Sequence, residues 1–162
     1  MNDLKNKMLI QKGNQGFTLV ELIITLAIAA ILMSLAVPSF NTTIKNNRLT
    51  TQANELISSI NYARSEAIRR GASVSLTSAS VNWHTGWVIA DNDGTTIRNH
   101  EAFDSGSSLV GSAATVTYRG TGFISAAAAI TYTLCDDRTG ETGRTITISL
   151  TGRPSVVDVT CS

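Results

Sequence analysis

The feature that most constrains this chain is a long apolar stretch near its N-terminus. It runs from Phe17 to Phe40 and contains one charged side chain, Glu21. As an α-helix this stretch would be about 36 Å long, whereas the hydrocarbon core of a bilayer is about 30 Å thick. The stretch therefore predicts a transmembrane helix over residues 17–40, surrounded by the lipid bilayer.

The segment before this stretch is polar and basic. Residues 1–16 end at Gly16 and carry Lys5, Lys7 and Lys12 against a single aspartate. Basic flanking segments stay on the cytoplasmic side of a membrane. The predicted topology is therefore single-pass, with the N-terminus in the cytoplasm and the residues after Phe40 on the other side.

The position of Glu21 separates three interpretations of the stretch. A charge costs about 2.5–3.5 kcal/mol at the centre of a membrane helix, and less near its end, where Glu21 lies. A cleaved secretory signal has small-residue sites available at residues 27–29 and 34–36, but its apolar core normally covers only about 7–15 residues. A plain single-pass anchor accounts for the length and leaves Glu21 as a tolerated interfacial charge. The third interpretation rests on a resemblance.

Residues 16–21, Gly-Phe-Thr-Leu-Val-Glu after a basic leader, resemble the processing site of type IV prepilins and type II secretion pseudopilins. The resemblance implies that residues 1–16 are a leader, removed after Gly16 by a prepilin peptidase. It implies that the new amine, on Phe17, is methylated. It also implies that Glu21 neutralises the amine of a neighbouring subunit in a filament, which would account for both the length and the charge.

The helical pattern continues beyond the membrane segment. Apolar residues recur at steps of three and four over residues 41–71, which predicts an amphipathic continuation of the anchor helix. Pro38 lies inside this pattern and predicts a bend, the alternative being two helices broken there. Gly71 is a suitable left-handed cap after Arg69 and Arg70. The apolar positions are Phe40, Ile44, Ala53, Leu56, Ile57, Ile60, Ala63, Ala67 and Ile68.

The pattern changes to alternation after Gly71, so residues 72–162 form a predicted β-rich globular domain. A turn is expected at 91–94, leading to 95–97, and a hairpin loop at 137–143. The Ser/Gly-rich residues 104–112 are expected to form a mobile loop. Together these elements predict an α+β fold, with one long bent helix packed on antiparallel sheets. The expected strands cover residues 74–77, 87–90, 116–118, 130–134, 145–150 and 156–159.

The only two cysteines, Cys135 and Cys161, fall on the predicted outer side of the membrane. That compartment is oxidising, so a disulfide is expected, pinning the last strand to the strand at 130–134. In the chain-entropy model, closing such a loop stabilises the fold by about 3 kcal/mol. His84 and His100 have no spacing that pairs them with these thiols, so no metal site is expected.

Several later motifs resemble the GspH/FimT family, which comprises minor pilins of type IV pili and the H pseudopilin of type II secretion. They are Asn-Tyr-Ala-Arg-Ser-Glu-Ala-Ile-Arg-Arg at 61–70, Gly86-Trp87 with Asp91, the strand at 145–150, and Thr-Gly-Arg-Pro at 151–154. The resemblance implies a pilin-like fold and no catalysis. It also implies a minor subunit that leaves the inner membrane and helps to initiate a filament, at or near its tip.

The resemblance also defines the expected partners. They are other minor and major pilins or pseudopilins, the prepilin peptidase and the inner-membrane assembly platform. The sequence leaves open whether the machine is a pilus or a secretion apparatus.

DNA is a second candidate partner, because some family members bind it through a C-terminal Gly-Arg-x-Arg loop. This chain matches at Gly152 and Arg153 but has Ser155 at the second arginine position. From Ala72 onward it has five Arg and no Lys against eight Asp and Glu, a net charge of −3. Only a local patch could therefore neutralise phosphates. Such a patch would combine Arg153 with Arg138, Arg144 or Arg119; otherwise Arg153 is an ordinary turn residue.

A membrane-anchored enzyme is the remaining class of protein. The sequence contains no Ser-His-Asp or Cys-His grouping, no phosphate-binding loop and no paired acid and base. Asp91-Asn92-Asp93-Gly94 lacks the spaced ligands of a calcium loop and is expected to be a turn. No catalytic residue and no cofactor is therefore expected.

Overall fold

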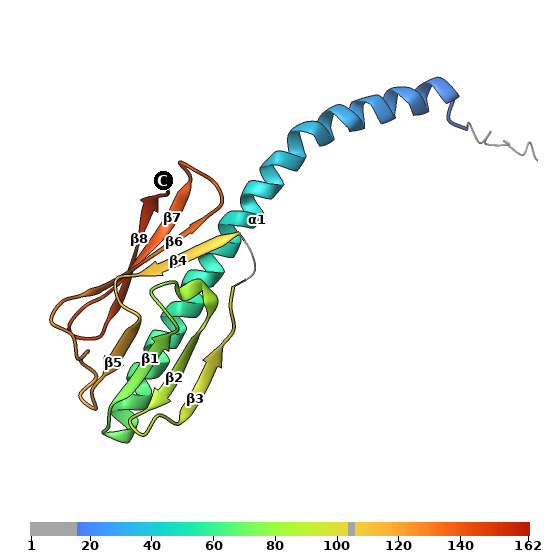
Figure 1. Cartoon of the computed structure of the whole chain (residues 1–162). Helices are drawn as coiled ribbons and strands as arrows, with labels where there is room; N and C mark the ends of the chain where they lie inside the picture. Colours follow the sequence, from blue (N-terminus) through green and yellow to red (C-terminus); the bar gives the residue numbers. More distant parts are fainter. Residues whose placement is uncertain (1–15, 104–105) are drawn as a thin grey trace, which may run out of the picture. The chain divides into compact units, whose positions relative to one another are not determined.

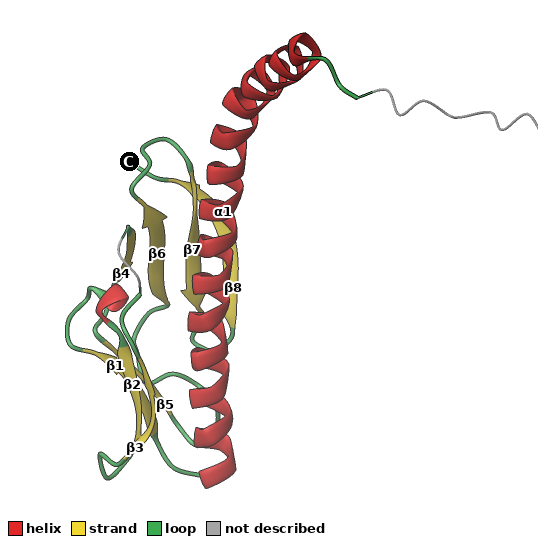
Figure 2. Cartoon of the chain, turned by 90° about the vertical axis from the view of Figure 1, so that its right-hand side faces the viewer, coloured by secondary structure: helices red, strands yellow, loops and turns green. Residues whose placement is uncertain are grey.

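The computed structural model describes residues 16–103 and 106–162. In these ranges it contains the α-helix α1, the short 3-10 helix η1 (Trp83–Thr85) and eight strands (Figure 1, Figure 2). The chain divides into two compact units, Met1–Asn41 and Thr42–Ser162. Each unit is described by itself below. Residues 1–15 of the predicted leader, which covers residues 1–16, lie outside the described residues.

Helix α1 is continuous from Leu19 to Arg70 and therefore contributes to both units. Its helical assignment includes Pro38, so the alternative of two separate helices is wrong. The bend expected at Pro38 stays a prediction. At the far end Gly71 adopts a φ of 62°, and its N–H donates to the carbonyl of Ile68 at 3.2 Å. Glycine suits this cap because it enters the left-handed region without a Cβ clash.

The second unit packs the last turns of α1 on two four-stranded antiparallel sheets (Figure 2). The first sheet has the order β3-β2-β1-β5 and the second the order β4-β6-β7-β8. This is the expected α+β fold of a helix on antiparallel sheets. The first sheet contains β1 (Val74–Ser78), β2 (Trp87–Asp91), β3 (Thr96–His100) and β5 (Thr115–Tyr118); the second contains β4 (Ser107–Gly111), β6 (Ile130–Asp136), β7 (Thr142–Ile148) and β8 (Pro154–Thr160).

One stripe of α1 supplies the helical side of the core. Its members recur every three or four residues, so they share one face and are nearly inaccessible to solvent: Leu49, Ala53, Leu56, Ile60, Ala63 and Ala67. The sequence pattern missed Leu49, which is 1% exposed. It also included Phe40, Ile44 and Ile68, which are 50% exposed or more, because periodicity alone does not say where the covering sheet ends.

The mobile loop expected at residues 104–112 is wrong for most of its length. Residues 107–111 form β4, an edge strand that pairs with β6 and places Leu109 opposite Leu134. Only Leu109 and Gly111 of this strand are buried. A short edge strand such as β4 buries few side chains, so serine and glycine are tolerated at most of its positions. Because β4 lacks an alternating apolar pattern, the sequence does not indicate a strand there.

Two other strands begin earlier than the sequence indicated. β7 begins at Thr142 instead of residue 145, and β8 begins at Pro154 instead of residue 156. Gly143 is the reason that the start of β7 is hard to recognise. A Cβ built on Gly143 would lie 2.5 Å from the Sγ of Cys161 and 3.0 Å from that of Cys135, so only glycine fits beneath the disulfide.

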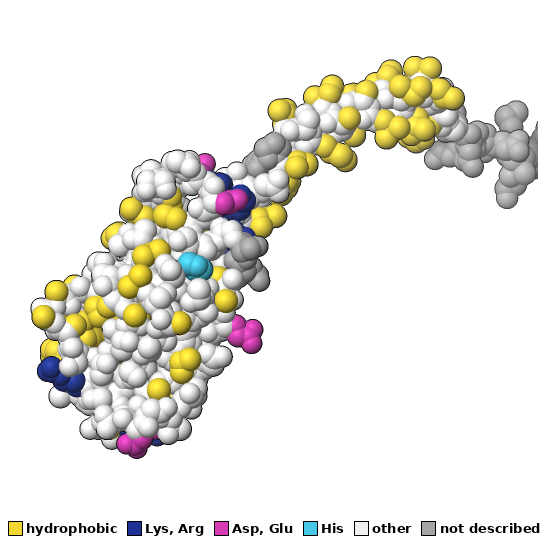
Figure 3. All heavy atoms as spheres, in the orientation of Figure 1, with side chains coloured by type: hydrophobic (Ala, Val, Ile, Leu, Met, Phe, Trp, Pro, Cys, Tyr) yellow, Lys and Arg dark blue, Asp and Glu magenta, His cyan; other side chains and the backbone are white. Residues whose placement is uncertain are grey.

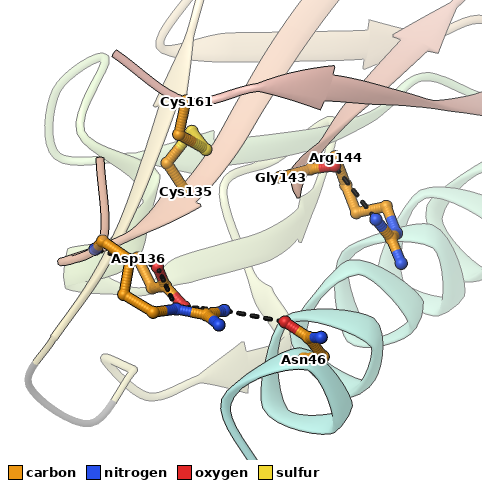
Figure 4. Close-up of a disulfide and its surroundings, with 7 residues drawn as sticks. Asn46, Cys135, Asp136, Gly143, Arg144 and Cys161 are labelled. Atoms are coloured by element: carbon orange, nitrogen blue, oxygen red, sulfur yellow. Dashed lines mark hydrogen bonds and ion pairs between the residues drawn. A yellow bond between two sulfur atoms is a disulfide. The ribbon is translucent and has the colours of Figure 1, made fainter. Parts of the chain in front are cut away.

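The disulfide between Cys135 and Cys161 is present, as expected (Figure 4). Cys135 lies near the end of β6, and Cys161 directly follows β8. Because β7 lies between these strands in the sheet, the bond closes the end of three strands around Gly143.

Candidate functional site

The described part of the first unit presents an apolar surface with almost nothing packed on it. Figure 3 shows hydrophobic side chains covering this part of α1. Phe17 is 88% exposed, and the large apolar residues from Leu19 to Phe40 are exposed by more than half. By length and composition α1 is able to cross a membrane, and its most apolar window has no residue buried within the structure. This surface requires an apolar environment, because exposing it to water is unfavourable.

The only charge on this surface, Glu21, is held by the start of its own helix. The backbone N–H of Thr18 donates to Oε2 of Glu21 at 2.9 Å, and the Thr18 hydroxyl donates to the same oxygen at 3.0 Å. In return the Glu21 N–H donates to Oγ1 of Thr18 at 3.2 Å. These reciprocal bonds form a capping box, in which Thr18 is the cap and Glu21 the third helical residue.

The capping box was missed in the sequence, although its signal, Thr-x-x-Glu, stands at residues 18–21. It gives Glu21 a local function that the sequence interpretations did not consider. Gly16 and Phe17 precede the helix in an exposed, irregular segment. The two residues joined by the predicted cleavage site therefore both lie outside regular secondary structure. Cleavage, methylation and the intersubunit role of Glu21 stay predictions.

A second charged cluster closes the other end of α1. Glu66 accepts hydrogen bonds from Arg69 at 2.7 Å and from Arg70 at 2.8 Å. Arg70 also reaches Asp91 at 3.1 Å, which ties the helix end to the turn after β2. The hydrogen bonds from Arg69 and then Arg70 lower the pKa of Glu66 to about 2. Glu66, Arg69 and Arg70 of the 61–70 motif are thus bound to one another, and Arg70 joins the helix to the first sheet.

Arg138, a candidate for DNA binding, is bound to an acid. Its guanidinium contacts the carboxylate of Asp136 at 2.6 Å and Oδ1 of Asn46 at 2.8 Å. Figure 4 shows Asp136 and Asn46 facing each other across this site. Burial alone would raise the pKa of Asp136, but the hydrogen bonds and charge of Arg138 outweigh it and hold the pKa below its usual value. Lys45 binds neighbouring Asp137 at 2.8 Å.

Arg144 is also paired with an acid. Its Nη1 lies 2.9 Å from Asp158, which is directly opposite on β8. Arg153 lies in the turn between β7 and β8, at the other end of the strands from the loop that carries Arg138. The two ends are separated by the length of β7, whose seven residues span about 23 Å. The structure therefore does not join Arg153 to Arg138 in one patch, and Arg138 and Arg144 are neutralised by carboxylates.

A different group of arginines lies at the end of the second unit that carries Gly152: Arg64, Arg119 and Arg153. The Nε of Arg64 donates to the carbonyl of Gly122 at 3.0 Å and would lie 3.3 Å from a Cβ on Gly152. Gly122 closes the turn that begins at Arg119, since its N–H donates to the Arg119 carbonyl at 2.8 Å. Within the described ranges, none of Arg64, Arg119 and Arg153 forms an ion pair with a carboxylate. Sequence reasoning missed Arg64 because it lies on the helix.

His100 and the Asp91 turn make contacts within the chain. His100 stacks on Trp87 with 3.9 Å between ring centroids, and its Nε2 lies 3.4 Å from Glu55. Oδ1 of Asp91 accepts the N–H groups of Asp93 and Thr95, as expected for a turn. Over residues 16–103 and 106–162, no group of three His, Cys, Asp or Glu side chains could hold a metal ion.

Helix α1, the two antiparallel sheets and the exposed apolar segment define a protein of the pilin class. Two solved structures share this fold, both of the type IV minor pilin FimU of Pseudomonas aeruginosa. The first is 24% identical, with a TM-score of 0.63, and the match covers 70% of this chain and 90% of that one. The second, another crystal form, is 23% identical, with a TM-score of 0.59, and the match covers 67% and 91%.

Residues 52–152 match the family described as type II transport protein GspH, and the chain belongs to this family. Residues 11–37 match the prokaryotic N-terminal methylation motif. The resemblance to the GspH/FimT family is thus confirmed. The chain is thus a pilin-like subunit of the kind found in type IV pili or type II secretion systems, and this family and fold are those of structural proteins. No curated protein sequence matches the chain.

Proposed function

We propose that this subunit helps to initiate assembly of a type IV pilus or a type II secretion pseudopilus. Prepilin peptidase cuts between Gly16 and Phe17, and the amine of Phe17 is methylated. The N-terminus is cytoplasmic, and the second unit is periplasmic until the assembly platform extracts the chain from the inner membrane. The subunit then lies at or near the filament tip, beside other minor pilins or pseudopilins.

One observation carries this proposal: an uncovered apolar helix surface with a single carboxylate, five positions into the predicted mature chain. Lipid can cover this surface before assembly, and neighbouring helices can cover it afterwards. The carboxylate of Glu21 is then the only group on the described part of that surface that can attract a charged amine from another subunit.

Intact-mass analysis of the membrane-extracted protein tests the processing step. The expected mass is that of residues 17–162 plus one methyl group. In a strain without the peptidase, the mass should be that of the full chain. A Gly16→Val chain in the complete host serves as the matched variant and should keep its leader. Full-length wild-type protein in a host with active peptidase would contradict the processing proposal.

DNA binding in natural transformation remains a second candidate function, favoured by the arginines around Gly152. Arg64, Arg119 and Arg153 have no carboxylate partner among the described residues, whereas Arg138 and Arg144 do. Phosphate neutralisation is favoured where a cation is not already paired with an acid. We therefore assign any DNA contact to the end of the second unit that carries Gly152.

Gel retardation of the detergent-extracted chain, at several salt concentrations, tests this assignment. If DNA is a ligand, Arg153→Ala and Arg119→Ala should weaken binding and make it less dependent on salt. Arg144→Ala, the matched control, should have little effect because Asp158 already pairs with that guanidinium. No retardation at low ionic strength would eliminate the DNA candidate.

A further inference from the structure

The two sheets end in four edge strands, and these differ in how well their outer edges are covered. Residues 123–125 cover β5, through a bridge from Tyr118 to Ile124 and a bond from the Ser125 N–H to the Thr117 carbonyl. Residues 81–82 cover β4, through a bridge from Asn82 to Val110. β3 carries Arg98, Asn99 and His100, and charged or polar side chains discourage pairing at an edge.

Among the described residues no segment pairs with the outer edge of β8, although the strand begins with a proline and carries the polar residues Ser155, Asp158 and Thr160. It is seven residues long, and five of them are exposed. Val156 is 40% exposed and Val157 is 60% exposed, and because neighbouring residues point to opposite faces, both faces of the strand present apolar surface. Its only charge, Asp158, is paired with Arg144. A long, uncovered edge with exposed apolar side chains is the kind that pairs with another strand.

The register of β7 and β8 identifies the free backbone groups. Ser149 donates its N–H to the Arg153 carbonyl at 3.1 Å, and Cys161 donates to the Glu141 carbonyl at 2.9 Å. Hydrogen-bonded pairs alternate along an antiparallel ladder. With the observed register, residues 155, 157 and 159 therefore bond to β7. The N–H groups of Val156, Asp158 and Thr160 point away from the sheet.

Pro154 is consistent with this assignment. It lies opposite Ile148 and occupies an outward position, where the N–H that proline lacks would not bond to β7. The first outward donor is therefore Val156, the third residue of β8, and the edge offers three donors at alternate positions. A row of main-chain donors and acceptors at strand spacing is complementary to another extended backbone.

We propose that β8 is an assembly surface that pairs with an edge strand of a different pilin or pseudopilin subunit. The proposal rests on the proposed function, which supplies such subunits as neighbours. The strand of the partner would run antiparallel to β8 and place β-branched or other apolar side chains against Val156 and Val157. Main-chain hydrogen bonds would give affinity, and these two valines would give register.

A second copy of this chain fits the edge less well, for two reasons. Gly152, before β8, lies beside Arg64, whereas Arg138, close to Cys161 after β8, contacts Asn46. β8 therefore runs antiparallel to α1. Two copies joined through β8 in antiparallel fashion would have their residue-42 ends pointing in opposite directions, and both could not be anchored in one membrane. The other three edges of this chain are covered or polar, as described above.

Photo-crosslinking in cells that assemble the filament tests the proposal. A photoreactive amino acid replaces Val157, and the cross-linked peptides are identified by mass spectrometry. The decisive variant is Val156→Pro, which removes one outward N–H without removing a bond to β7. The matched control is Val156→Thr, which keeps both the N–H and the branched shape. Thr160→Pro repeats the test near the end of the strand, where its effect on folding is smaller.

The expected cross-link joins position 157 to an edge strand of another pilin subunit. It should persist in Val156→Thr and fall about tenfold in the two proline variants, because a missing donor and a proline ring oppose pairing. A cross-link to a second copy of this chain, no cross-link, or an undiminished cross-link in both proline variants would overturn the proposal. Intact mass is measured in parallel, since loss of processing contradicts the proposed function and not the role of β8.

Discussion

At the scale of single residues, Glu21 and Glu66 show how a carboxylate is held near the two ends of one helix. Glu21 completes a capping box with Thr18, and Glu66 is bound by Arg69 and Arg70. The first arrangement uses neutral donors, so no cation among the described residues compensates the negative charge of Glu21. The second neutralises the charge in place. This contrast fits an assembly role for Glu21 and a structural role for Glu66.

The Glu66 cluster predicts a dependence of stability on pH. Its folded-state pKa of about 2 is below the model-compound value of 4.5, so the ionised form favours the folded state. The stabilisation is complete above about pH 5 and is lost as the pH falls through 2. Urea unfolding of the detergent-extracted chain between pH 7 and pH 2 should therefore show a difference between wild type and Glu66→Gln that shrinks on acidification.

A matched control for this prediction is Glu101→Gln, the same chemical change at an exposed carboxylate outside the cluster. It should reduce stability less than Glu66→Gln at neutral pH. If the difference between wild type and Glu66→Gln is the same at pH 7 and at pH 2, the ion pairs of Glu66 do not stabilise the fold.

At the scale of elements, the second sheet contains strands that the sequence predicts, such as β6, and one that it does not, β4. Alternation made β6 recognisable, because Ile130, Tyr132 and Leu134 all face the core. β4 has one large buried side chain, Leu109, and was taken for a loop. The two cysteines predicted the disulfide correctly. The requirement for glycine at position 143 is evident only once the positions of both sulfur atoms are known.

The same limit applies to the candidate sites. The processing pattern of residues 16–21 was recognisable because its residues are consecutive in the sequence. The arginine pairs are not local, since Arg138 contacts Asn46 and Arg144 contacts Asp158 only after the sheets form. Sequence reasoning therefore named four arginines for DNA binding, and the structure leaves only Arg119 and Arg153 of these without an acidic partner in the described part of the chain.

At the scale of the whole molecule, the chain combines two surfaces that need different partners. The apolar surface of the first unit needs lipid or neighbouring helices, and the β8 edge of the second unit needs a strand. Membership of the GspH family and the methylation motif accord with such a subunit. In this account the apolar helix packs against the helices of any pilin in the filament, whereas β8 pairs only with particular neighbouring subunits.

The central claim is that the charge of Glu21, and not its capping function, carries assembly. Glu21→Gln separates the two, because glutamine can still complete a capping box but has no charge. Thr18→Ala is the complementary variant, since it breaks the box and keeps the charge, and Glu21→Ala removes both.

The most direct measurement is the fraction of the subunit recovered in sheared filaments, with filament number counted in the same cells. The account predicts that Glu21→Gln and Glu21→Ala chains accumulate in the membrane and are lost from filaments, whereas Thr18→Ala chains are incorporated. Incorporation of Glu21→Gln at the wild-type level, with unchanged filament number, would contradict it.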